Sequence, residues 1–217
     1  MTWKKVFKQL HQSYSPRQYR VLNTYSHDDI KFRLQNYHKA VFVRDPIIRL
    51  LSAYQSKFRE PSCRNTTIMK EWEQLYGKII ARAYRTQGED TVNGWFNITL
   101  VEFVRYVTEM AGNKLSQRSD HFIPMHILVN PCAVQYDFIG HFENIKIEGP
   151  FMLRFLGIQD QVTFPDFKSS HALENLNKEY QQVPIKLFKE IYKYYRTDYE
   201  LFGYSFWDML ETIYFNH

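Results

Sequence analysis

Apolar residues recur at steps of three and four along much of this 217-residue chain, and that spacing is typical of amphipathic helices. The stretches with this spacing predict helices over residues 3–13, 28–36, 46–58, 66–86 and 143–157, from Thr99 onward, and in the tail from Val183. Residues 87–98 and 112–135 are expected to be irregular, because polar residues or prolines interrupt the apolar steps there. The pattern therefore predicts a helix-rich protein.

Two short runs predict strands. KAVFVR at residues 39–44 is typical of a buried strand in a parallel sheet, and YDFIGHFE at 136–143 predicts a short strand that leads into the helix over 143–157. Few strands among many helices predict an α/β fold in which a small parallel sheet is flanked by helices. No linker rich in Pro, Gly or Ser and no internal repeat divides the sequence, so residues 1–217 are expected to form a single domain.

Composition and charge narrow the functional classes. Hydrophobic residues make up 44% and aromatic residues 17% of the chain, which suffices for a packed core and excludes disorder. The sequence contains no apolar run of about 18 residues and no apolar leader, so the pattern predicts neither a membrane span nor a signal peptide. The net charge of +5 favours an anionic partner. Nucleic acid is not expected, because the charges are dispersed and no nucleic-acid-binding signature is present.

Candidate chemistry is concentrated where the strand that ends at Arg44 meets the next helix. Asp45 and Pro46 supply an N-cap and a first-turn proline, so the helix begins at once with its amides pointing back over the strand end. Such a helix start can bind an anion. Arg44 can hold a phosphate with two parallel hydrogen bonds, and Ser52, two turns along, can donate its hydroxyl. The alternative is that Arg44 pairs with a carboxylate and that Ser52 is a packing residue.

Four blocks of the sequence resemble one protein family. VFVRDPIIRLLSAYQSKF at residues 41–58 resembles the 3′-phosphate-binding motif of the Golgi carbohydrate sulfotransferases of the chondroitin/dermatan 4-O type. Further blocks at 97–107, 119–145 and 196–204 are similar to other blocks of that family in the same order and spacing. The resemblance extends over nearly the whole chain. It implies the sulfotransferase fold, which is P-loop-like, with a small parallel sheet flanked by helices.

This resemblance implies a reaction and a cellular setting. A sulfuryl group would move from 3′-phosphoadenosine 5′-phosphosulfate, the co-substrate, to a hydroxyl of a glycosaminoglycan or related glycan, free or on a proteoglycan. Arg44 and Ser52 fall on the positions that hold the donor's 3′-phosphate. The protein would act in the Golgi lumen as a type II membrane protein whose anchor lies outside these 217 residues. No metal is expected, because the spacing of the histidines and cysteines matches no zinc pattern.

The amino terminus corresponds to only part of the family's second donor element, a phosphosulfate loop of the form strand–PKxxCTNW–helix. Thr2, Lys4 and Lys5 resemble the end of that loop and the first turn of its helix, whereas the first strand and the loop lysine are missing from the sequence. We expect a domain incomplete at its amino end that transfers little sulfate, since the amides that cradle the 5′-phosphate are missing. For Lys4 and Lys5, the alternative is that they form a solvated basic face of a helix. For the whole chain, the alternative function is a non-catalytic module that binds a nucleotide or a glycan.

The acceptor hydroxyl needs a base, and histidine suits this role because its pKa lies near neutrality. His121 is the candidate, because it lies in the third family-like block and follows Asp120, which can orient its ring. The alternative for His121 is a packing histidine. Arg49 and Lys57, on the helix after Arg44, can bind anionic donor or glycan, with solvated surface charges as the alternative.

Cysteines and sequons add two weaker expectations. Cys63 and Cys132 allow at most one disulfide, but Val129 replaces the first of two cysteines in the family block, so two free thiols are the alternative. Asn65 and Asn97 begin N-x-T sequons and are expected to be glycosylated only if the protein is lumenal, as the resemblance implies.

Overall fold

The structure is a computed structural model that describes residues 22–59, 67–86, 91, 94–111, 119–166 and 175–215. The helix predicted over residues 3–13 lies outside this part of the chain. Contacts divide the chain into two compact units, one formed by Met1–Val43 with Val129–Lys168 and one by Arg44–Leu128 with Ser169–His217. Each unit is described by itself below.

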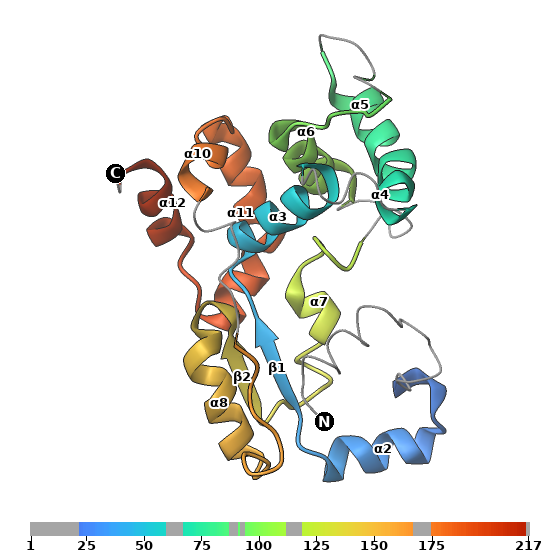
Figure 1. The fold of residues 1–217 in the computed structure, drawn as a ribbon, viewed down its shortest axis with the longest axis vertical. Coiled ribbons are helices and arrows are strands. Elements are labelled where there is room, and N and C mark those ends of the chain that lie inside the picture. The colour runs from blue at the N-terminus through green and yellow to red at the C-terminus, as the bar shows by residue number, and fades with distance from the viewer. Residues whose placement is uncertain are drawn as a thin grey trace. The chain divides into compact units, whose positions relative to one another are not determined.

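The first unit contains the parallel sheet. Strand β1 (Ala40–Val43) pairs with β2 (Phe138–His141) in parallel, with Ala40 opposite Phe138 and Val43 opposite His141. Helix α8 (Ile145–Phe155) follows β2 after the short 3-10 helix η6 (Phe142–Asn144) and packs against it, as Figure 1 shows. The 3-10 helix η1 (Leu22–Thr24) and helix α2 (His27–Asn36) precede β1. The predicted fold, helix-rich with a small parallel sheet, is confirmed.

The second unit consists of helices in the part of the chain that the structure describes. In chain order they are α3 (Pro46–Tyr54), η2 (Gln55–Arg59), α4 (Thr67–Trp72), η3 (Glu73–Gly77), α5 (Lys78–Tyr84), α6 (Leu100–Arg105), η4 (Tyr106–Ala111), α7 (Met125–Val129), α10 (Leu176–Tyr180), α11 (Ile185–Phe202) and α12 (Phe206–Tyr214). The segments η2, η3 and η4 are π-helical and continue the helices before them. Such π-helical turns often occur at functional sites.

The apolar face predicted for the helix after Asp45 forms the centre of this core. Its five members are all buried: Ile47, Leu50, Leu51, Tyr54 and Phe58. They pack with α6 and α11, which lie beside α3 (Figure 1). Burying large apolar side chains stabilises a fold by about 1.5–3 kcal/mol each, so this face anchors α3 in its unit.

Helix α7 corrects the prediction that residues 112–135 are irregular. Pro124 directly precedes α7, a position where the missing amide of proline costs no hydrogen bond. The first amides of α7 donate to the carboxylate of Asp198 on α11, at 2.6 Å from Met125 and 2.9 Å from His126. Because this cap comes from a distant part of the sequence, no local capping signal predicted the helix.

Asp45 caps α3 as predicted, but its capping corrects the expectation that the amides of this helix bind an anion. Ile47 and Ile48 donate their amides to the Asp45 carboxylate at 2.8 and 3.0 Å. Arg49 donates its amide to the Asp45 carbonyl, and Pro46 has no amide hydrogen. These amides are therefore engaged, and the buried carboxylate places negative charge at the helix start. An anion near Arg44 would therefore not be bound by the amides of Ile47, Ile48 or Arg49.

Replacing Asp45 with Ala should lower the free energy of unfolding by about 1–2 kcal/mol, because two buried amides lose their acceptor. Urea denaturation followed by circular dichroism measures the change. Ser26→Ala is the matched control, since Ser26 caps the exposed helix α2 through the amide of Asp29 and should cost less. If both variants lost the same free energy of unfolding, burial of the Asp45 cap would not increase its contribution to stability.

No helix among the described residues combines the length and the apolar character needed to cross a bilayer.

Candidate functional site

The structure places the two residues predicted to bind the donor's phosphate at α3. Arg44 precedes the N-cap of this helix and Ser52 lies in its second turn, and both residues are partly buried. They belong to the second unit, which also contains the other candidate residues Arg49, Lys57 and His121. The predicted role of Arg44 and Ser52 stays a prediction.

His121 lies in a tight turn that begins at Ser119. The amides of Phe122 and Ile123 donate to the Ser119 carbonyl at 3.1 and 3.0 Å, and the amide of His121 donates to the Ser119 hydroxyl at 3.3 Å. The His121 side chain is exposed, so its ring can be reached by a substrate. The Asp120 carboxylate, which was expected to orient this ring, makes no hydrogen bond with it.

The His121 ring instead packs against Trp72. The two rings meet edge to face, with 5.3 Å between their centroids. Tyr76 stacks on Trp72 with 4.6 Å between centroids, and the Lys57 ammonium lies 5.0 Å from the Trp72 ring centroid. A cation over an aromatic face is favourable, so Trp72 stabilises the position of the Lys57 ammonium, and its ring also contacts the His121 imidazole.

The surroundings of His121 favour its neutral form. Desolvation of the ring is the largest cause that lowers the pKa of His121, and the positive charges of Lys57 and Arg49 lower the pKa further. The Asp120 carboxylate acts in the opposite direction and is outweighed. At neutral pH the imidazole is therefore unprotonated and can accept a proton from a hydroxyl group.

Arg49 is engaged by the turn that carries His121. Its two terminal nitrogens donate to the carbonyls of Ile123 and Asp120 at 2.6 and 2.5 Å. Burial lowers the pKa of the Arg49 guanidinium, and the negative charges of Asp198 and Asp120 oppose that shift. Arg49 is therefore not a solvated surface charge, because its guanidinium binds the backbone of this turn. The binding of substrate by Arg49 and Lys57 stays a prediction.

The remaining candidate residues are placed only in part. Thr2, Lys4, Lys5, Cys63 and Asn65 lie outside the described residues. The other half of the suggested disulfide, Cys132, is exposed, and the pairing stays a prediction. Asn97 is also exposed. Among the residues that the structure describes, no group of three or more His, Cys, Asp or Glu side chains is arranged to hold a metal ion.

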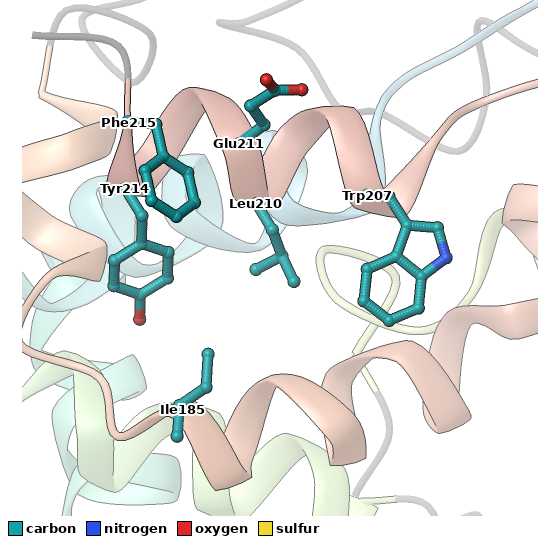
Figure 2. Close-up of a pocket in the computed structure, with 6 residues that line it drawn as sticks. All are labelled: Ile185, Trp207, Leu210, Glu211, Tyr214 and Phe215. Atoms are coloured by element: carbon teal, nitrogen blue, oxygen red, sulfur yellow. The ribbon is translucent and has the colours of Figure 1, made fainter.

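A groove at the carboxyl-terminal helices has a different character. It has a volume of about 680 Å³ and is lined by residues from the start of α11 and from α12 through Phe215, as Figure 2 shows: Ile185, Trp207, Leu210, Glu211, Tyr214 and Phe215. Glu211 is the one charged residue among these six. A groove with a carboxylate and no cation does not suit an anionic donor, so the candidate site remains the cluster around His121.

Sequence reasoning missed Trp72, Tyr76, Tyr195 and Asp198, which contact His121 or its turn. Trp72 and Tyr76 belong to an aromatic-rich helical stretch, and no sequence signal there distinguishes a residue of the site from a residue of the core. Asp198 lies in the family-like block at residues 196–204, and that block was the available signal.

Comparisons with known proteins show what this chain is similar to. Residues 3–205 match the sulfotransferase family. Carbohydrate sulfotransferase 14 of Danio rerio is 33% identical over 181 residues, which cover 82% of this chain and 46% of that protein. Carbohydrate sulfotransferase 11 of Rattus norvegicus is 30% identical over 189 residues, covering 86% of this chain and 52% of the relative. The chain thus spans about half the length of the curated relatives it matches. No solved structure matches it.

Proposed function

Because this chain belongs to the sulfotransferase family, we propose that it transfers a sulfuryl group from 3′-phosphoadenosine 5′-phosphosulfate to a hydroxyl of a glycan, with His121 as the base. The observation that carries this proposal is the position of the His121 imidazole against Trp72, whose ring also contacts the Lys57 ammonium. Desolvation and the charge of Lys57 lower the pKa of His121, which suits a base. The relatives are carbohydrate sulfotransferases, which favours a sugar hydroxyl as the acceptor.

The proposed step is an in-line displacement at sulfur. The sugar oxygen forms a bond to sulfur while the bond from sulfur to the 5′-phosphate oxygen breaks, and the electron pair of that bond stays with the departing nucleotide. The proton of the sugar hydroxyl moves to a ring nitrogen of His121. Lys57, held beside the imidazole by Trp72, supplies positive charge where the sulfuryl oxygens gain negative charge. The products are the sulfated glycan and adenosine 3′,5′-bisphosphate.

The donor's 3′-phosphate is assigned to Arg44 and Ser52. The positions of both residues match the family motif, and the guanidinium suits two parallel hydrogen bonds to a phosphate. Because Asp45 already engages the amides of α3, these side chains would supply most of the binding energy for that phosphate. Thr2, Lys4 and Lys5 are proposed to contribute on the 5′ side, as the resemblance of the amino terminus implies.

The acceptor class and the location rest on the resemblance of the sequence blocks. We propose a glycosaminoglycan or related glycan as the acceptor and the Golgi lumen as the place of action. Glycosylation at Asn65 and Asn97 would accompany a lumenal location. Treating protein from a secretory expression host with a deglycosylating enzyme tests this point, because two occupied sequons would give two steps in mass.

Activity should persist to a lower pH than the ordinary imidazole pKa of about 6.5 would allow. The base must be neutral, and the pKa of His121 is lowered, so protonation stops the reaction only at more acidic pH. A profile of kcat/KM against pH for the complete gene product measures this acidic limb. An acidic limb centred above 6.5 would contradict the assignment of the base to His121.

The proposed function is tested with donor labelled in its sulfuryl group and a panel of desulfated glycans. The complete gene product should move label into a glycan and release an equal amount of adenosine 3′,5′-bisphosphate. Nucleotide binding without any transfer would instead favour the non-catalytic binding module. The same assay on residues 1–217 alone measures the expected loss of activity in this stretch.

A further inference from the structure

The turn that carries His121 is fixed at five backbone groups by three side chains from two helices. Arg49 of α3 binds the carbonyls of Asp120 and Ile123. Tyr195 of α11 donates its hydroxyl to the carbonyl of Phe122. Asp198 lies one turn further along α11. Its carboxylate accepts hydrogen bonds from the amides of Met125 and His126, the first two residues of α7. Every one of these contacts lies within the second unit.

The Asp198 carboxylate is a charged group that is almost fully buried. It is 1% exposed and accepts three hydrogen bonds, the third from the His126 ring at 2.6 Å if Nδ1 carries the proton. A buried carboxylate costs free energy unless such partners compensate it. Its position at the start of α7 therefore fixes the end of the turn that follows His121.

Tyr195 fixes the middle of the same turn. Its side chain is 1% exposed and its hydroxyl binds the carbonyl of the residue directly after His121. Burial raises the pKa of the Tyr195 hydroxyl well above its usual range, so this group stays protonated and acts as a donor. Because the carbonyl of Phe122 is fixed, the backbone next to His121 is fixed as well, and this restricts the direction in which the His121 side chain points.

His121 needs this support, because no hydrogen bond from the described residues fixes its ring. The ring packs against Trp72, and such a contact leaves the imidazole free to rotate or shift if the backbone moves. A base must lie within about 3 Å of the proton it accepts, and a misplacement of about 1 Å can lower a rate by about 100-fold. The backbone of the turn must therefore determine where the imidazole lies.

We propose that Tyr195 and Asp198 of α11, together with Arg49 of α3, are positioning residues that hold the 120–126 turn so that the His121 imidazole lies against Trp72 and beside Lys57. This inference rests on the proposed function for its catalytic consequence. The placement of the ring is a separate matter that can be measured without any turnover.

Tyr195→Phe tests the proposal, because it removes one hydroxyl and no carbon. Tyr54→Phe is the matched control: the Tyr54 hydroxyl is also buried and donates to a backbone carbonyl, that of Ile98, at 3.0 Å. In the wild-type chain, an NMR titration should show the pKa of His121 below about 6.5, with the resonance assigned by its loss in His121→Ala. The charged groups that face this ring are Lys57, Arg49 and Asp120.

Tyr195→Phe should raise the pKa of His121 toward its ordinary value, because the loosened turn moves the ring toward water and away from the two cations. It should also lower kcat about tenfold or more, with little change in the KM for the donor. Tyr54→Phe should change neither quantity, and Asp198→Asn should act like Tyr195→Phe with a larger effect. Identical titrations and rates for the two tyrosine variants would overturn the proposal. If no sulfate is transferred at all, the proposed function fails, and the titration still decides whether Tyr195 positions the ring.

Discussion

Replacing His121 with Ala should lower sulfotransfer by a factor of about 10² to 10⁴, while the affinity for adenosine 3′,5′-bisphosphate stays within about twofold. The imidazole is exposed beside Lys57 and is the proposed acceptor of the hydroxyl proton. Without it the proton must leave to water, which raises the barrier to the chemical step. Nucleotide binding should be spared, because the 3′-phosphate is assigned to Arg44 and Ser52.

The measurement is a single-turnover transfer rate with saturating donor, accompanied by calorimetric titration of the desulfated nucleotide. His27→Ala is the control, because the His27 side chain is 94% exposed on helix α2 and lies in the first unit. This variant should transfer sulfate at the wild-type rate. A His121→Ala variant that retains more than half of the wild-type rate would refute the role given to His121.

Replacing Arg44 with Ala should weaken nucleotide binding by about 100-fold or more. Two charge-assisted hydrogen bonds from one guanidinium to a phosphate are among the strongest polar contacts in proteins. The amides of α3 cannot take over this task, because Ile47 and Ile48 already donate to Asp45. Ser52→Ala should cost less, since it removes a single neutral hydroxyl.

Arg44→Lys provides a second test of the same contact. Lysine keeps the charge but loses the forked geometry, so it should recover only part of the affinity. Arg82→Ala is the matched control, because Arg82 is an exposed arginine on α5 with no role in the proposed site. Calorimetry measures all four variants, Ser52→Ala included, and circular dichroism checks that each is folded. Equal affinity for the Arg44→Ala and Arg82→Ala variants would remove the donor site from the start of α3.

Local signals in the sequence were sufficient for much of the fold. The apolar run before Arg44 predicted β1, and Asp45 with Pro46 predicted the start of α3, because strand burial and helix capping depend on neighbouring residues. A small parallel sheet was predicted as well, and the structure shows that it is formed by β1 and β2. The family-like blocks identified His121, and the structure places it in an exposed turn.

Contacts between distant residues could not be predicted in this way. The cap of α7 comes from Asp198, 73 residues from Met125, so the sequence around α7 shows no sign of it. Trp72 is a site residue only because its helix lies beside the turn of His121. The helix amides next to Arg44 were expected to bind an anion, but capping by Asp45 competes for the same donors. In each case the outcome depends on packing or on competition that no single pattern encodes.

The central claim is that the acceptor hydroxyl meets His121 while the donor's 3′-phosphate lies at Arg44. A structure of the complete gene product with adenosine 3′,5′-bisphosphate and an acceptor oligosaccharide measures this directly. We expect one sugar hydroxyl about 3 Å from a His121 ring nitrogen, with the 3′-phosphate hydrogen-bonded to Arg44 and Ser52. An oligosaccharide bound with every hydroxyl out of reach of His121, or a nucleotide whose 3′-phosphate avoids Arg44, would contradict it.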